Sequence, residues 1–304
     1  MDTVQKSAFV AIVGKPNVGK SSLLNKLLGE KIAIVTAKPQ TTRRRITGVL
    51  TRGASQFVFI DTPGFHKPKT KLSNYMDNAV TASIQDVDTA LFVAEPAGRL
   101  TEAEQELLGR LKESGAHSLL IINKIDLLKN KEEIAARIAE LSALHDFDAV
   151  VPVSVLNDDG LDIVLAELEK LAEEGPHYFP DDTLTDQPER VITAEIIREK
   201  LLLNLQQEIP HGTAVVIEKQ REREGRPEDD PLLDIEATIF CEKASHKGMI
   251  IGKGGAMLKK IASEARSDIE AFLDVRVNLQ CWVKVKEDWR NSDSMIRNFG
   301  LDQA

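Results

Sequence analysis

The chain has 304 residues, of which 42% are hydrophobic and 29% are charged, and its formal net charge at pH 7 is -9. This length is enough for two hydrophobic cores, and the composition is typical of a globular protein rather than a disordered one. The negative charge argues against nucleic-acid binding over the whole surface, because such binding depends on Lys and Arg that neutralise phosphates.

The cysteines and the apolar segments bear on where the protein works. Cys241 and Cys281 are too few for a disulfide framework and lie in apolar runs, so we expect them to be reduced core residues. The first residues lack the pattern of an export signal, and no apolar run approaches the roughly 18 residues that a membrane span needs. A cytoplasmic location is therefore expected.

The first part of the chain, residues 1–173, alternates apolar runs with amphipathic ones. The runs at 8–13, 56–60, 89–94, 118–123 and 149–154 are predicted strands, and helices are predicted around 21–29, 101–114 and 131–145. Continuous apolar strands separated by helices predict an α/β domain with a mostly parallel sheet that is covered on both faces. Ligands of such sheets bind beyond the carboxyl ends of the strands.

The rest of the chain has a different organisation. Residues 174–190 contain three prolines and many acids without periodicity, which predicts a linker. Residues 191–290 predict a smaller α+β domain with a helix at 191–208, strands at 214–223 and 232–241, a helix at 256–273 and a last strand at 275–285. Residues 291–304 are left as a C-terminal tail.

A glycine-rich loop follows the first predicted strand. The sequence GKPNVGKS, from Gly14 to Ser21, fits the pattern G-x-x-x-x-G-K-[ST] and opens the next helix. In such loops backbone N–H groups surround phosphates, the lysine (Lys20) reaches the outer phosphates, and the hydroxyl of Ser21 ligates Mg²⁺. The predicted nucleotide-binding residues here are Gly14, Lys15, Pro16, Asn17, Val18, Gly19, Lys20, Ser21 and Ser22.

The sequence NKID comes directly after the strand that ends near residue 122, at the same sheet edge as the glycine-rich loop. The carboxylate of Asp126 can accept hydrogen bonds from guanine N1–H and from the exocyclic amine together, a pair of donors that adenine lacks. The motif therefore predicts GTP rather than ATP. Asn123 is expected to fix the turn, and the stem of Lys124 is expected to lie over the purine.

A third motif, DTPG, ends the strand at 56–60. Asp61 is placed to hold Mg²⁺ through a water, Thr62 and Pro63 complete the nucleotide contacts, and the N–H of Gly64 is placed to sense a terminal phosphate. Between the loops, either Thr41 or Thr42 could complete the metal shell. The predicted catalytic residues are Lys20, Thr41, Thr42, Asp61 and Gly64, and the predicted metal ligands are Ser21, Thr41, Thr42 and Asp61.

These motifs, in this order, resemble the translation-factor-like class of regulatory GTPases. Two positions depart from its pattern: the usual Ser-Ala pair near the base is Ser154-Val155, and Phe65 stands where many small GTPases carry a glutamine that orients the attacking water. A phenyl ring cannot orient water, so hydrolysis needs a partner, another group or an ion. Related GTPases with Asn at the position of Asn17 bind K⁺, which predicts faster hydrolysis in K⁺ than in Na⁺.

A second glycine turn, IIGKGG, comprises Gly252, Lys253, Gly254 and Gly255. It lacks the strand and the spacer of a phosphate loop, and the order strand, strand, helix, G-x-x-G, helix, strand resembles a type II KH module. That likeness predicts single-stranded RNA on the glycines, with Lys253 at a phosphate. Ile250 and Ile251 are expected to line the groove for bases, and Lys247, Lys259 and Lys260 to widen the basic footprint. The alternative is a helix corner made only for packing.

The GTPase motifs and the KH module together resemble the Era-like GTPases over nearly the whole chain. The resemblance implies a GTP-hydrolysing switch that binds the 3′ end of 16S ribosomal RNA, acts in 30S subunit assembly, and associates peripherally with the inner membrane face; a monomer is expected. Two alternatives remain. One is an RNA-binding module with a structural nucleotide domain, and the other is a GTPase whose KH domain contacts proteins or membranes.

Other residues receive weaker assignments. Residues 36–47 and 65–71 are polar and without periodicity, and are the candidate switching element that would couple the nucleotide state to RNA affinity. The six histidines lack the spacing of a zinc site. Trp282 and Trp289 are expected to pack the last strand and its exit.

Overall fold

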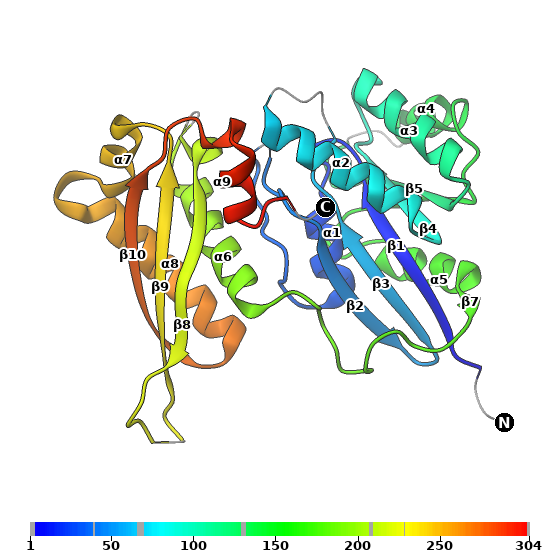
Figure 1. The fold of residues 1–304 in the computed structure, drawn as a ribbon. Coiled ribbons are helices and arrows are strands. Elements are labelled where there is room, and N and C mark those ends of the chain that lie inside the picture. Colours follow the sequence, from blue (N-terminus) through cyan, green and yellow to red (C-terminus); the bar gives the residue numbers. More distant parts are fainter. Residues whose placement is uncertain are drawn as a thin grey trace.

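A computed structural model describes residues 4–38, 40–65, 70–128, 132–206, 209–227 and 229–302. Two sheets organise these residues, one in each half of the chain (Figure 1). None of the helices among the described residues is both long enough and apolar enough to cross a bilayer.

The larger sheet has the strand order β2-β3-β1-β4-β5-β6, with β7 added beside β1. All its pairings are parallel except β2 with β3 and β7 with β1, so the predicted mostly parallel sheet is confirmed. The strands are β1 (Lys6–Val13), β2 (Ile46–Arg52), β3 (Ser55–Asp61), β4 (Thr89–Ala94), β5 (His117–Asn123), β6 (Ala149–Val153) and β7 (Glu173–Glu174). Strands β2 and β7 were not expected from the sequence.

Helices cover both faces of this sheet. Leucines of α1 (Lys20–Leu28) and α5 (Leu161–Leu171) pack against one face, and apolar residues of α2 (Lys71–Gln85), α3 (Glu102–Ser114) and α4 (Glu132–Ser142) pack against the other. Thr70 and Thr101 begin α2 and α3 with capping boxes, in which the threonine side chain and the third helical residue satisfy each other's backbone N–H groups. A short 3₁₀ turn, Ile125–Leu127, follows β5.

The smaller sheet has the order β10-β9-β8, with β8 antiparallel and β10 parallel to β9. Its strands are β8 (Ala214–Glu222), β9 (Leu232–Cys241) and β10 (Arg276–Val285), and its helices are α6 (Glu189–Asn204), α7 (Ala244–Ile251), α8 (Ala256–Leu273) and α9 (Asp293–Asn298). Short 3₁₀ turns span Pro210–Gly212, Lys253–Gly255 and Trp289–Asn291. Residues of α6, α7 and α8 form one core with the sheet, so the α+β fold of the second half is confirmed.

The segment between the two sheets runs along the edge strand β2. Val49 N donates to Leu184 O, and the side chain of Gln56 bonds to the backbone of Phe179 and Tyr178. The bond from Val49 satisfies a backbone group of the edge strand β2 that would otherwise be open for pairing, and Gln56 lies on the neighbouring strand β3. The predicted linker therefore lies against the first half of the chain.

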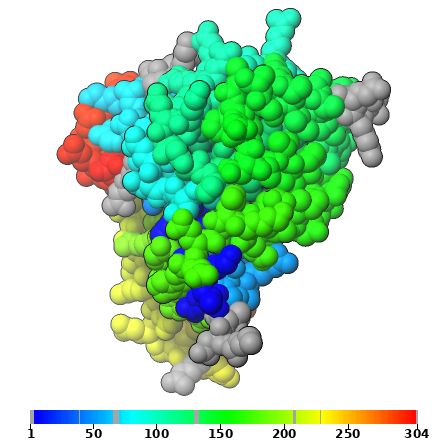
Figure 2. Space-filling model, turned by 90° about the vertical axis from the view of Figure 1, so that its right-hand side faces the viewer, coloured from blue at the N-terminus to red at the C-terminus, as the bar shows by residue number. Residues whose placement is uncertain are grey.

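The C-terminal residues pack between the two halves. Trp289, Ile296 and Phe299 form a buried cluster with Leu72 and Met76 of α2. In Figure 1 α9 lies beside both β8 and α2, and in Figure 2 red C-terminal residues lie against cyan residues of the first half. The packing expected for Trp289 is confirmed, but Trp282 is 44% exposed on β10, so the same expectation was wrong for that residue.

Candidate functional site

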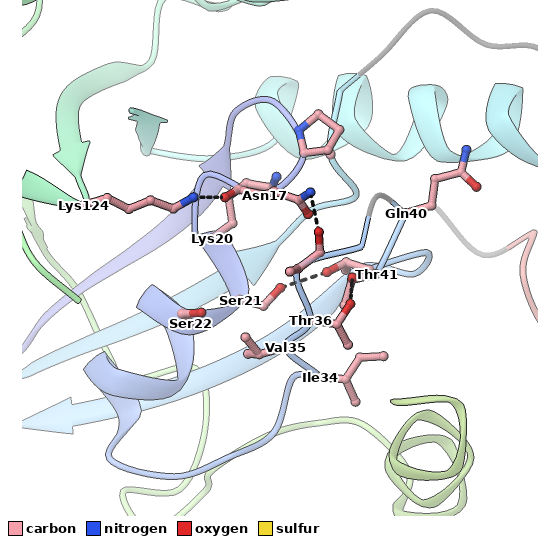
Figure 3. Close-up of a pocket in the computed structure, with 15 residues that line it drawn as sticks. Asn17, Lys20, Ser21, Ser22, Ile34, Val35, Thr36, Gln40, Thr41 and Lys124 are labelled. Carbon is pink, nitrogen blue, oxygen red and sulfur yellow. Dashed lines mark hydrogen bonds between the residues drawn. The ribbon is translucent and has the colours of Figure 1, made fainter. Parts of the chain in front are cut away.

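The carboxyl ends of neighbouring strands bring the sequence motifs together. The glycine-rich loop follows β1, Asp61 ends β3 and Asn123 ends β5, all at one edge of the sheet. Two adjoining cavities of about 480 and 920 Å³ open there, and Gly19, Ser22, Val35 and Lys124 line both. Figure 3 shows the smaller one, between the glycine-rich loop and residues 34–42.

Lys20 is buried beneath the glycine-rich loop. Its Nζ donates to Gly14 O at 3.1 Å and to Lys15 O at 3.0 Å. Burial lowers the pKa of Lys20 to about 8, although the nearby charge of Asp61 opposes the shift. An ammonium held by two carbonyls at the loop is positioned for an anionic ligand, as the motif predicts.

Gly64 meets the glycine-rich loop closely. A Cβ added at Gly64 would lie 2.7 Å from the Cα of Pro16, so a side chain there would force the two loops apart. The close approach brings the DTPG motif next to the loop expected to hold phosphates.

Three oxygen-bearing side chains meet beside Lys20. Ser21 Oγ donates to Asp61 Oδ2 at 2.6 Å and lies 2.8 Å from Thr42 Oγ1, and Thr42 Oγ1 donates to the same carboxylate at 3.3 Å. Burial raises the pKa of Asp61 to about 6, against the lowering effects of Lys20 and of the two hydroxyls. Its buried Oδ1 has no hydrogen-bond partner among the described residues.

This cluster fits Mg²⁺, which prefers hard oxygen ligands and a carboxylate. Of the two threonines left open by the sequence, Thr42 lies in the cluster. The hydroxyl of Thr41 instead donates to Lys38 O at 2.7 Å and lies 2.7 Å from Thr36 Oγ1 (Figure 3).

The side chain of Asn123 joins three loops. Its Oδ1 accepts from Lys124 N at 2.8 Å and from Val155 N at 3.1 Å, and its Nδ2 donates to Val18 O at 2.8 Å. The amide thus holds the NKID turn against the glycine-rich loop, in the role that the sequence suggested. It also occupies the backbone N–H of Val155.

Asp126 and Lys124 flank the larger cavity. Asp126 is exposed, and its Oδ1 accepts from Ser154 Oγ at 2.6 Å, which orients the carboxylate. Lys124 has a left-handed backbone (φ 68°), and its Nζ donates to Asn17 O at 2.6 Å (Figure 3). The arrangement leaves a carboxylate facing a cavity large enough for a purine.

Phe65 lies outside the nucleotide cavity. Its side chain is 4% exposed and packs in the core with residues such as Val80 and Leu107, and the Arg110 guanidinium lies 4.5 Å from its ring centroid. The ring therefore contributes packing and a cation–π contact. Residues 66–69 of the predicted switching element lie outside the described residues.

Helix α6 of the second half binds the segment that carries Thr42. Arg198 donates to Thr41 O, and Val35 N donates to Glu199 Oε1 at 3.0 Å. Lys38 donates to the carbonyls of Leu202 and Leu205 at the end of this helix. The candidate switching segment is thus in direct contact with the KH half of the chain.

Arg43 makes a further contact across the two halves. Its guanidinium donates to Thr213 O at 2.6 Å and to His211 O at 2.7 Å, and its side chain is 2% exposed. Burial, reinforced by the charge of Arg198, lowers the pKa of Arg43 to about 9. No local sequence pattern indicates these contacts, because their partners are about 170 residues away.

The glycines of the second glycine turn have positive φ angles. Gly252, Gly254 and Gly255 have φ of 72°, 60° and 81°, a region that favours glycine. Lys253, Lys259 and Lys260 are exposed around the turn and Lys247 is half-buried. These residues form a basic, glycine-lined surface.

One residue expected in the RNA groove lies elsewhere. Ile250 is fully buried in the core of the small domain and Ile251 is half-buried against it, so Ile250 does not line an open groove. Met249, the preceding residue in the helix, is 53% exposed. Successive side chains of a helix point about 100° apart, so Ile250 points into the core while Met249 points to solvent.

Comparison with known proteins agrees with this geometry. Residues 9–124 match the family described as 50S ribosome-binding GTPase, and residues 208–290 match the KH domain family. GTPase Era of Ruminiclostridium cellulolyticum is 51% identical over 295 residues, which cover 97% of each chain. GTPase Era of Clostridioides difficile is 48% identical over 297 residues, which cover 98% of this chain and 99% of that one.

Solved structures give the same result. A tyrosine-to-alanine variant of Aquifex aeolicus Era bound to GDP·AlF₄⁻ has a TM-score of 0.93 and 36% identity, covering 98% of this chain and 99% of that one. Era in complex with MgGDPNP and nucleotides 1506–1542 of 16S ribosomal RNA matches with the same score, identity and coverage. The chain therefore belongs to the Era family and is a GTPase with a C-terminal KH domain.

Proposed function

We propose that this GTPase is a nucleotide-controlled switch that binds the single-stranded 3′ end of 16S ribosomal RNA and acts in assembly of the 30S subunit. The solved Era complex with nucleotides 1506–1542 of 16S ribosomal RNA supports the choice of RNA. The exposed Lys253 on a glycine-lined turn supplies the chemistry, because close approach and a cation suit an RNA backbone.

The nucleotide roles follow from the two cavities. Asp126 would accept from the guanine edge, Lys20 would meet the outer phosphates, and the Gly64 N–H would meet the terminal phosphate. Ser21 and Thr42 would hold Mg²⁺ directly and Asp61 through a water, and the bound ion would neutralise charge on the phosphates. The relative solved with MgGDPNP supports this metal.

The observation that supports nucleotide control of RNA binding is the hydrogen bond from Arg198 to Thr41 O. Thr41 adjoins the threonine beside Ser21 and Asp61, so any movement of that segment on loss of the terminal phosphate acts on α6. Coupling of this kind requires that the GTP and GDP states differ in RNA affinity.

The test is Gly254→Asp, which adds a side chain and a negative charge to the turn. We expect RNA affinity to fall by about tenfold or more, because RNA binding depends on close backbone approach and on positive charge, while GTP hydrolysis is unchanged. Gly53→Asp is the matched control, since Gly53 has φ of 61° against 60° at Gly254 and both have open space around the Cβ position.

Crosslinking to total RNA in GTP, GDP and nucleotide-free states, followed by sequencing of the bound fragments, reads out both affinity and target. Undiminished crosslinking of Gly254→Asp would contradict the RNA assignment and favour the alternative, a GTPase that acts through protein or membrane partners. The cytoplasmic location, the peripheral membrane contact and the monomeric state stay predictions.

We also propose K⁺ as a second cation of the reaction. Asn17 supports this, since it lies in the glycine-rich loop with φ of 66° and donates from Nδ2 to Ala37 O at 2.9 Å, which connects the loop to the switching segment. Hydrolysis is expected to be faster in K⁺ than in Na⁺ at matched ionic strength, and equal rates would remove this role from Asn17.

A further inference from the structure

Glu95 lies between the two loops of the nucleotide site, although the sequence motifs do not include it. It directly follows β4, and β4 lies between β1 and β5 in the sheet. Since β1 leads into the glycine-rich loop and β5 into the NKID loop, the residue after β4 emerges between them.

The carboxylate of Glu95 bonds to a lysine from each loop. Oε2 lies 3.2 Å from Nζ of Lys15, and Oε1 lies 2.7 Å from Nζ of Lys124. Nζ of Lys124 also donates to Asn17 O at 2.6 Å. Lys124 thus joins the NKID loop to the glycine-rich loop, and one oxygen of Glu95 fixes where its ammonium lies.

The side chain of Glu95 is charged in this setting. Partial burial raises the pKa of Glu95, but hydrogen bonds from Lys124 and Lys15 lower it more, so the net shift is below the ordinary value for Glu. With the side chain 31% exposed, solvent weakens these ion pairs without removing them.

A buried ion pair supports the backbone at this position. Arg137 Nε donates to the carbonyl of Glu95 at 3.3 Å, and Arg137 Nη2 lies 2.6 Å from Oε1 of Glu104. The side chains of Arg137 and Glu104 are 2% and 1% exposed. The carboxylate is therefore presented from a backbone that α3 and α4 hold in place.

We propose that Glu95 is a positioning residue that slows the release of guanine nucleotide, by holding the glycine-rich loop and the NKID loop together over the bound ligand. A nucleotide that spans both cavities leaves when these loops separate, and Glu95 connects them through Lys15 and Lys124. The inference rests on the nucleotide roles proposed above. It predicts an effect on release and not on the chemical step, because Glu95 contacts neither the Mg²⁺ cluster nor Lys20.

The experiment is Glu95→Gln in the full chain, with release of fluorescent mant-GDP followed by stopped flow. We expect release to be about five- to tenfold faster, as befits two partly exposed ion pairs. Single-turnover GTP hydrolysis should stay within about twofold of wild type. Glu167→Gln is the matched control, because Glu167 makes an ion pair of 2.7 Å with Lys170 on α5, away from both loops.

A double-mutant cycle separates positioning from general destabilisation. Lys124→Met removes the shared partner, so adding Glu95→Gln to it should speed release by less than Glu95→Gln does alone. Wild-type release from Glu95→Gln, or fully additive effects in the cycle, would overturn the role of Glu95. Failure of the wild-type protein to bind mant-GDP would instead overturn the nucleotide site itself.

Discussion

Arg198 of α6, in the second half of the chain, donates a hydrogen bond to the backbone carbonyl of Thr41, one residue before the threonine whose hydroxyl lies 2.8 Å from Ser21 Oγ. A single peptide unit therefore separates the predicted metal cluster from a helix of the second half. Glu195 holds the same guanidinium, with Oε1 3.0 Å from Arg198 Nε and Oε2 bonded to the Nη2 that donates to Thr41. The contact gives the two halves a short mechanical path.

Arg198→Lys tests this path. A lysine keeps the charge beside Glu195 but cannot also reach the Thr41 carbonyl as a planar fork does, so we expect a loss of about 1–2 kcal/mol in the free energy of unfolding. RNA affinity should then depend less on the nucleotide. Binding of a 16S 3′-end RNA, measured with GDP and with a non-hydrolysable GTP analogue, gives the ratio, and a ratio equal to wild type would contradict the coupling.

The two threonines should differ sharply. Thr42→Ala removes a hydroxyl from the cluster with Ser21 and Asp61, and we expect hydrolysis to fall by about 100-fold, as when one group that stabilises transition-state charge is lost. Thr41→Ala loses bonds to Lys38 and Thr36 and should cost less than about tenfold. The measurement is the rate of GTP hydrolysis by both variants at saturating GTP over a range of Mg²⁺ concentrations. A larger loss in Thr41→Ala would reverse the assignment.

Asp126→Asn should exchange the base preference. The amide cannot accept from two guanine donors, so affinity for GTP should fall by roughly 100-fold, as expected for lost hydrogen bonds to a charged group. Xanthosine triphosphate, which has a carbonyl in place of the exocyclic amine, should bind the variant better than GTP does. Ser154→Ala is the control, since it removes only the hydroxyl that orients Asp126. Retained GTP preference in calorimetry would disprove recognition by this carboxylate.

His177 makes stability depend on pH. Its ring bonds to Ala54 O at 3.0 Å and to Asp181 at 2.7 Å, which raises the pKa of His177 in the folded state. Its contribution is fully present below the unfolded pKa of about 6.5 and is lost as pH rises through the raised folded value. The Tm difference between wild type and His177→Gln should therefore shrink from about pH 6 to about pH 8. A constant difference would show that folding does not raise the pKa of His177.

The phosphate loop, the DTPG turn and the NKID turn could be predicted because each is a short local pattern placed by strand order. Residues joined over long separations could not. Arg43 meets Thr213 and Lys38 meets Leu202 through tertiary packing that no periodicity encodes. Strand β2 was missed because ITGVLTR is partly polar and contains a glycine, and its pairing with β3 decides its structure. The prediction for Ile250 was wrong because the glycine turn alone does not show which face of the preceding helix points into the core.

Residues 289–301 have one more consequence, which concerns how the protein is made. Their apolar side chains cover Leu72 and Met76 of α2, although more than 200 residues separate the two segments. During synthesis, α2 leaves the ribosome long before its cover does, and that patch stays open to water until residues 289–301 emerge. The nucleotide half thus completes its packing only after the second half has been synthesised.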